Sequence, residues 1–110
     1  MANKYNEQFV PVMDDLMLGM AEVEQGKMFG IPGYMVKGKL AVGFYEQGVI
    51  AKVGRDKAQA LISGGSAQAF EPQPGRVWKD WVLLTVASPE GLRTHSDLFK
   101  SAVRYVFDTN

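Results

Sequence analysis

The chain has 110 residues, 46% of them hydrophobic and 22% charged, and its 12 basic residues balance its 12 acidic ones. This length predicts one domain, residues 1–110, with a core large enough to be stable without disulfides or a bound metal. The composition is that of a globular protein and excludes a disordered chain. Because the net charge is zero, the chain lacks the overall positive electrostatic potential expected of a nucleic-acid-binding protein. The absence of cysteine excludes disulfides, thiol nucleophiles and thiolate metal sites.

The amino-terminal residues carry no signal for export. The sequence Met-Ala-Asn-Lys-Tyr-Asn-Glu-Gln lacks the apolar stretch of a signal peptide, and no apolar run reaches membrane-spanning length. We therefore expect a cytoplasmic protein with no membrane segment.

The first predicted element is a helix from about Lys4 to Met20. Its apolar residues recur at steps of three and four, which places them on one helical face. Pro11 either kinks this helix or marks the first turn of a shorter one. Asp14 and Asp15 are adjacent and point apart, so we expect both to be solvated rather than paired.

Three short strands are predicted next, at Tyr34–Val36, Leu40–Tyr45 and Val49–Val53, because aromatic and β-branched residues dominate them. The pairs Lys37-Gly38 and Gln47-Gly48 separate the strands, and each suits a two-residue hairpin turn in which glycine takes a positive φ. The segment is predicted to be an antiparallel meander.

A helix at Arg55–Ser63, a strand near Ala69–Glu71, a central strand at Trp81–Val86 and a final helix from Ser88 follow. Serine and proline at 88 and 89 suit the start of that last helix. Its buried face is predicted to consist of Leu92, Leu98, Phe99, Ala102, Val103 and Val106. The order α-β-β-β-α-β-β-α predicts an α+β fold, a two-layer α/β sandwich with helices on one face of an antiparallel sheet.

The two predicted turns fix which residues share a face of the sheet. Met35 would oppose Leu40, Phe44 would oppose Ala51, and Val42 would oppose Val53, all facing the core. The other face would carry Tyr34, Val36, Lys39, Ala41, Gly43, Tyr45, Ile50 and Lys52.

That second face has two interpretations. Antiparallel sheets commonly leave one face exposed to solvent, so the favoured interpretation is that these lysines and tyrosines lie on a solvent-exposed surface. Gly43, which the register places opposite Lys52, favours a close approach by another group. The alternative is therefore a surface that binds a protein, a small anionic ligand or a second copy of the chain.

The run from Arg76 to Trp81 is the second candidate site. Trp78 and Trp81 alternate with Arg76 and Lys79, which could provide a stacking surface beside positive charge, as in nucleic-acid or anionic-ligand sites. The favoured interpretation is packing, in which Trp81 begins the core strand and Trp78 closes a loop over the sheet end.

No catalytic residue, metal or cofactor is predicted. His95 is the single histidine, and no serine lies in a nucleophile motif. Lys52 and Tyr45 are the candidates for general acid–base chemistry if the protein is a small-molecule enzyme.

Three runs resemble the TfoX amino-terminal-domain family: residues 26–40, residues 48–53 and residues 70–82. Met28-Phe29-Gly30 stands where that family carries its Met-Phe-Gly motif, and Lys52 follows the apolar run of the third strand as in the family. The resemblance implies a two-layer fold like those of secretion chaperones and YjbR-like proteins, in a soluble bacterial protein.

The resemblance implies little about chemistry, because the family offers no agreed catalytic residue. Its named member is a competence regulator with a second, carboxy-terminal domain, which we do not expect in this chain. We predict a non-enzymatic binding or regulatory module. The alternatives are a homodimeric interaction protein and a transcription-associated regulator, although zero net charge argues against nucleic acid.

Overall fold

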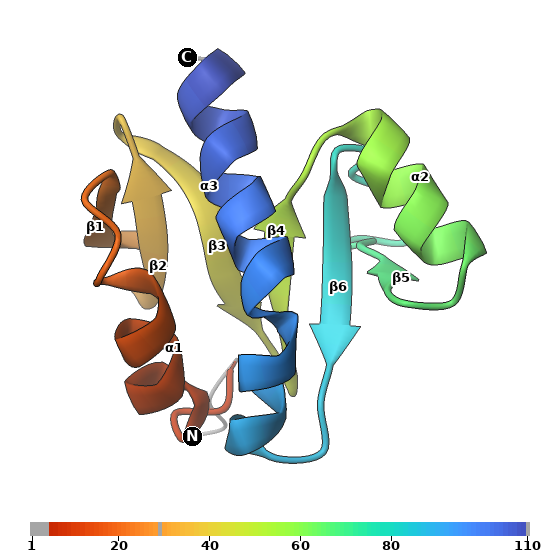
Figure 1. Cartoon of the computed structure of the whole chain (residues 1–110). Helices are drawn as coiled ribbons and strands as arrows, with labels where there is room; N and C mark the ends of the chain where they lie inside the picture. The colour runs from red at the N-terminus through yellow and green to blue at the C-terminus, as the bar shows by residue number, and fades with distance from the viewer. Residues whose placement is uncertain (1–4, 29, 110) are drawn as a thin grey trace.

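The protein folds into two layers (Figure 1). The structure is a computed structural model that describes residues 5–28 and 30–109. The elements are α1 (Phe9–Met17), β1 (Val23–Met28), β2 (Ile31–Val36), β3 (Lys39–Tyr45), β4 (Gly48–Lys52), α2 (Arg55–Ser63), β5 (Gln68–Ala69), β6 (Trp81–Thr85), the 3-10 helix η1 (Pro89–His95) and α3 (Ser96–Thr109). The six strands form one antiparallel sheet in the order β1-β2-β3-β4-β6-β5. Helices α1 and α3 cover one face, and α2 lies beside β6. The predicted α+β fold is confirmed, and the element order has one strand more than predicted.

The additional strand is β1, which pairs with β2 along its whole length from Val23↔Val36 to Met28↔Ile31. Its sequence, Val-Glu-Gln-Gly-Lys-Met, has no aromatic residue and a single β-branched one, Val23, so it lacks the composition that marks strands. Because β1 is an edge strand with only one neighbour, polar residues are tolerated there, and the strand was not predicted.

The hairpin between β2 and β3 turns at Lys37-Gly38, as predicted. Both residues have positive φ, 52° and 78°, which matches the twist of the flanking strands. Further along the hairpin the pairing shifts: Met35 opposes Leu40, but Tyr34 opposes Val42. Ala41 is therefore an extra residue, a β-bulge, and it is fully buried.

The second turn lies elsewhere than predicted. Tyr45 pairs with Gly48, so the turn is centred on Glu46-Gln47, and Glu46 has a φ of 50°. The prediction of a Gln47-Gly48 turn is wrong because Gly48 belongs to β4, where it pairs with Thr85 of β6. The register of β4 is displaced by two residues.

This displacement changes the partners across β3 and β4. Val42 opposes Ala51 and Phe44 opposes Val49, where Val53 and Ala51 were predicted. Gly43 opposes Ile50 rather than Lys52. A displacement of two residues keeps each side chain of this strand pair on its own face, because the side-chain period of a strand is two.

The helix boundaries follow the predicted pattern more closely. Helix α1 begins at Phe9, so Pro11 lies in its first turn, where a missing N–H costs nothing. The predicted start near Lys4 lies outside the described residues. Helix α2 has the predicted bounds, and the segment predicted as the last helix divides into η1 and α3.

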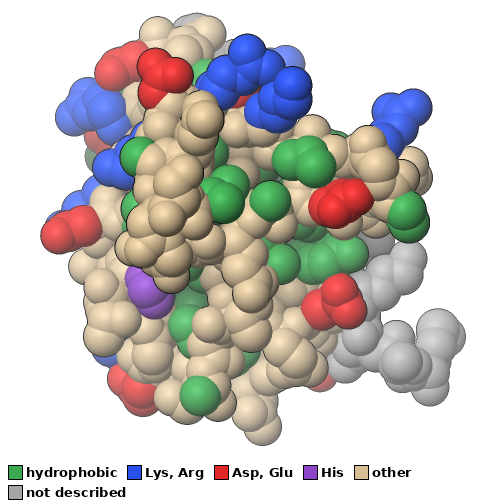
Figure 2. All heavy atoms as spheres, turned by 90° about the vertical axis from the view of Figure 1, so that its right-hand side faces the viewer, with side chains coloured by type: hydrophobic (Ala, Val, Ile, Leu, Met, Phe, Trp, Pro, Cys, Tyr) green, Lys and Arg blue, Asp and Glu red, His purple; other side chains and the backbone are tan. Residues whose placement is uncertain are grey.

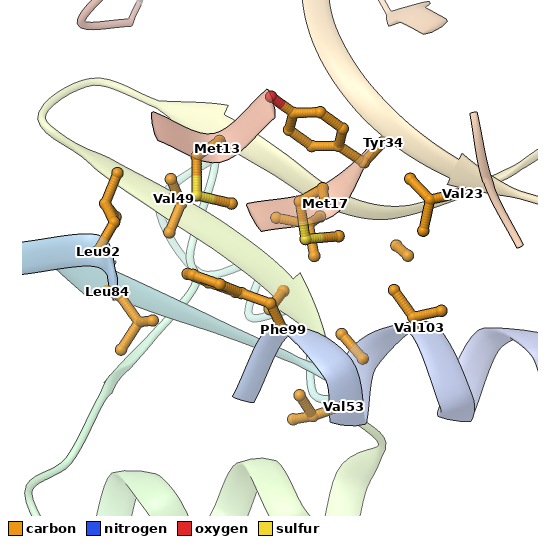
Figure 3. Close-up of a cluster of buried hydrophobic side chains, with 14 of the residues drawn as sticks. Met13, Met17, Val23, Tyr34, Val49, Val53, Leu84, Leu92, Phe99 and Val103 are labelled. Carbon is orange, nitrogen blue, oxygen red and sulfur yellow. The ribbon is translucent and has the colours of Figure 1, made fainter. Parts of the chain in front are cut away.

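The core lies between the sheet and the helices α1, η1 and α3 (Figure 3). Five of the six positions predicted to be buried in the last helix are buried: Leu92, Phe99, Ala102, Val103 and Val106. The sixth, Leu98, is only partly buried. Among the described residues, no helix combines the length and the apolar character required to cross a bilayer.

Candidate functional site

The residues predicted to share one face of the sheet lie on both. Tyr34 pairs with Val42 and Lys39 pairs with Val36, and both valines are buried under the helices. Tyr34 and Lys39 therefore belong to the helix-covered side of the sheet, and the prediction that they lie beside Tyr45 and Lys52 is wrong. The bulge at Ala41 is the reason, since one extra residue moves every following side chain to the other face.

Tyr34 is a structural residue of the core rather than part of an open surface. Its side chain is fully buried (0% exposed), and its hydroxyl donates a hydrogen bond of 2.6 Å to Oδ1 of Asp14. Gln25 donates to the same oxygen at 3.1 Å. Burial, this hydrogen bond and the charge of Asp14 raise the pKa of Tyr34 well above its usual value.

These contacts also correct the expectation for the two aspartates. Asp14 ties α1 to the sheet, and Asp15 accepts a bond of 2.7 Å from Arg93 of η1. The two carboxylates do point apart, but neither is merely solvated.

We expect Tyr34→Phe to lower the free energy of unfolding by about 1–2 kcal/mol near neutral pH, because Asp14 loses its buried donor. The loss should shrink as pH rises above about 10. There the unfolded tyrosine ionises while the folded one does not, so wild-type stability falls by up to about 1.4 kcal/mol per pH unit. The phenylalanine variant lacks this dependence.

Urea unfolding of both proteins at neutral pH and at about pH 11 tests this. Tyr45→Phe is the matched control, because no hydrogen bond of its hydroxyl is found among the described residues. Equal pH dependence in wild type and Tyr34→Phe would contradict the expected behaviour.

The face of the sheet opposite α1 and α3, here called the open face, is shaped by glycines. A Cβ at Gly26 would lie 2.9 Å from Cγ of Met35, and one at Gly33 would lie 2.7 Å from Cδ1 of Leu40. At Gly43 the contacts are looser, since a Cβ would lie 3.5 Å from Cγ1 of Ile50 and 3.6 Å from Cδ2 of Leu40, which is ordinary van der Waals contact. The close approach to the backbone is therefore found at Gly26 and Gly33, and the neighbours of Gly43 are the chain's own side chains.

Residues 70–81 cover part of the open face with a row of aromatic rings. The Phe70 ring, 3% exposed, lies 4.9 Å from that of Tyr45 and 5.0 Å from that of Trp78, and Trp78 lies 5.6 Å from Trp81. The backbone fixes the row, because the N–H of Trp78 donates to the carbonyl of Phe70 at 2.9 Å. Trp78 closes this loop as the packing interpretation expects, yet its side chain remains 41% exposed.

Beside Trp78 lies a hollow of about 230 Å³, here called the Trp78 hollow. Its lining consists of apolar residues, two of them prolines: Ile31, Pro32, Leu40, Gly43, Phe44, Ile50, Pro72 and Trp78. Gly43 is the predicted site residue that joins Trp78 there. No single strand supplies this lining, so the hollow could not be predicted from any one motif.

The other predicted residues are not assembled into one site. Lys52 opposes Trp81 and Tyr45 opposes Gly48, so they are separated by four residues of β4, about 13 Å along the strand. This separation prevents them from acting as an acid–base pair. Arg76 is exposed in the turn after Gly75 and does not line the Trp78 hollow.

A second hollow, about 440 Å³ in volume, lies between α2 and residues 77–79. Its lining is Arg55, Gln59, Ile62, Ser63, Val77 and Lys79, and we call it the α2 groove. Of these, Val77 and Lys79 belong to the run from Arg76 to Trp81 that was predicted as a candidate site. Over residues 5–28 and 30–109, no group of three His, Asp or Glu side chains is placed to hold a metal ion.

Comparisons with protein-family models, with curated proteins and with solved structures each returned no match. The resemblance to the TfoX amino-terminal-domain family therefore stays a prediction. Phe29 of the Met28-Phe29-Gly30 motif lies outside the described residues.

Proposed function

We propose that the protein is a non-catalytic binding module that recognises a partner protein through Trp78 and the Trp78 hollow. The observation that carries this proposal is a tryptophan that stays 41% exposed although rings of Phe70 and Trp81 flank it. Tryptophan is among the residues that contribute most to protein interfaces. A tryptophan already fixed by its neighbours loses little conformational freedom on binding.

The size and lining of the Trp78 hollow favour an apolar side chain as its occupant. Pockets for drug-sized ligands have volumes of about 300–1,000 Å³, and this hollow, at about 230 Å³, is smaller. Its lining offers no charged group. A partner would therefore insert one apolar or aromatic side chain beside Trp78 and rest the surrounding backbone on the loop.

The resemblance to the TfoX amino-terminal-domain family supports a non-enzymatic role and a regulatory setting. The separation of Tyr45 from Lys52 supports it as well, because these were the candidates for acid–base chemistry. Transcription-associated regulation through a protein partner fits the zero net charge better than direct contact with nucleic acid.

Self-association is the second candidate function. Val77 and Trp78 are adjacent, and both expose large apolar side chains. A two-fold interface would bring this patch against the same patch of a second copy. Sedimentation over a range of protein concentrations tests it, and a monomer at every concentration would remove this candidate.

A display selection of random peptides on the immobilised protein tests the binding proposal. We expect enriched peptides to share an apolar or aromatic residue and to bind Trp78→Ala about 30-fold more weakly, because loss of a central tryptophan costs about 2 kcal/mol. Leu18→Ala is the matched control, since Leu18 is 42% exposed and does not line the Trp78 hollow.

Two results would contradict the binding proposal. One is a selection that enriches no peptide. The other is a set of enriched peptides that bind Trp78→Ala as well as wild type, with thermal unfolding showing that the variant is folded.

A further inference from the structure

The segment 77–79 separates two hollows of different chemistry. Trp78 lines the apolar Trp78 hollow, whereas its neighbours Val77 and Lys79 line the α2 groove. We propose that the α2 groove is a second binding site, which takes a small organic anion. Its carboxylate is held by Arg55 and Lys79, and its apolar body lies on Ile62 and Val77.

The helical contribution to this groove is one continuous face of α2. Arg55, Gln59, Ile62 and Ser63 are spaced at i, i+4, i+7 and i+8, which aligns them along one side of a helix. The face that packs on the core carries Ala58, which is buried. The groove face of α2 is therefore free of core packing and available to a ligand.

Within residues 5–28 and 30–109, the two cations of the groove have no carboxylate partner. Among the described residues, both ion pairs are made by Arg93, one with Asp15 and one with Glu90. Asp56 and Asp80 follow Arg55 and Lys79 in the chain, but neither lines the groove. Figure 2 shows Lys and Arg side chains at the upper end of the molecule on this side, together with some Asp and Glu side chains.

The apolar side chains of the groove are exposed to solvent. Ile62 and Val77 are 36% and 46% exposed, and they are two of the four large apolar side chains exposed in the described part of the chain. Both line the α2 groove. An apolar ligand body would remove them from water, which is favourable in proportion to the area covered.

This combination selects a carboxylate attached to an apolar chain. The guanidinium of Arg55 matches the two oxygens of a carboxylate, and Lys79 adds a second positive charge. Gln59 and Ser63 offer further donors on the same wall. The volume, about 440 Å³, falls within the range of small-molecule sites, about 300–1,000 Å³.

Calorimetric titration of the full chain with sodium octanoate tests the site, with octanamide as the uncharged ligand of nearly the same shape. Acetyl-Leu-Leu, a peptide with a free carboxylate, provides a second arm. We expect octanoate to bind at least about tenfold more tightly than octanamide, the difference that one charge-assisted contact provides. Tighter binding of acetyl-Leu-Leu than of octanoate would support the site and identify a peptide terminus as its source of carboxylate.

Substitutions of the groove residues test whether octanoate binds in the α2 groove. Arg55→Gln and Lys79→Gln should each weaken octanoate binding at least about tenfold, in line with loss of one hydrogen bond to a charged group. Lys57→Gln is the matched control, because Lys57 is an exposed cation of the same helix that does not line the groove. Octanoate binding is measured independently of peptide binding to the Trp78 hollow, so failure here is distinguishable from failure of the proposed function.

Three results would overturn the proposal. They are the absence of binding for both carboxylates at millimolar concentration, equal affinity for octanoate and octanamide, and full octanoate affinity in the folded double variant Arg55→Gln/Lys79→Gln. The affected side chains are exposed, so these variants should fold as the wild type does.

Discussion

Gly48→Ala should lower the free energy of unfolding by about 3 kcal/mol, the upper range for forcing atoms into a packed interior. A Cβ at this position would overlap the carbonyl oxygen of Leu84 in β6. That oxygen belongs to the backbone of a central strand, so it cannot rotate away as a side chain could. Relief requires β4 and β6 to move apart at the pair Gly48↔Thr85.

Urea unfolding measures the effect as a lower midpoint with an unchanged m value, together with a melting temperature lower by about 15 °C. Gly19→Ala is the matched control, because a Cβ there meets no atom within 4 Å. Its stability should differ from wild type by less than about 0.5 kcal/mol. Equal stability of Gly48→Ala and Gly19→Ala would contradict the close approach of β6.

Gly48 also shows why the register could not be predicted from the sequence. Lys37-Gly38 and Gln47-Gly48 look alike locally, since each is a polar residue followed by glycine between apolar runs. Gly38 is required by its positive φ of 78°, a property of the turn itself. Gly48 is required by the carbonyl of Leu84, a contact between segments far apart in the chain.

The bulge at Ala41 changed the predicted site more than the displaced register at Gly48 did. Leu40-Ala41-Val42 is a continuous apolar run, so no alternation of polar and apolar residues marks the extra residue. That single residue assigns Tyr34 and Lys39 to the helix side and leaves Gly43, Tyr45 and Lys52 on the open face. A site that depends on strand register therefore needs the structure.

The helices were predicted better because their signal is local. The period of apolar residues in α3 identifies Phe99, Val103 and Val106 without knowledge of any partner. The α2 groove is the opposite case, since it forms only where α2 meets residues 77–79. From sequence alone, the polar face of α2 is indistinguishable from an ordinary solvated surface.

Phe99→Ala should lower the free energy of unfolding by about 4 kcal/mol, within the range measured for truncating buried phenylalanines. The Phe99 side chain is 0% exposed and lies in the buried cluster between the helices and the sheet (Figure 3). Side chains of α1, such as Met13 and Met17, belong to the same cluster. Elements of both layers surround the ring, so the cavity cannot close by the movement of one helix.

Leu98→Ala is the matched control for this substitution. Leu98 precedes Phe99 in the same helix but is only partly buried, so its loss should cost about 1 kcal/mol. Phe99→Leu should recover about half of the stability lost in Phe99→Ala, because it refills part of the cavity. Urea midpoints of the three variants test this order. Equal losses in Leu98→Ala and Phe99→Ala would mean that helix propensity, rather than the contact between α3 and the rest of the core, sets the effect.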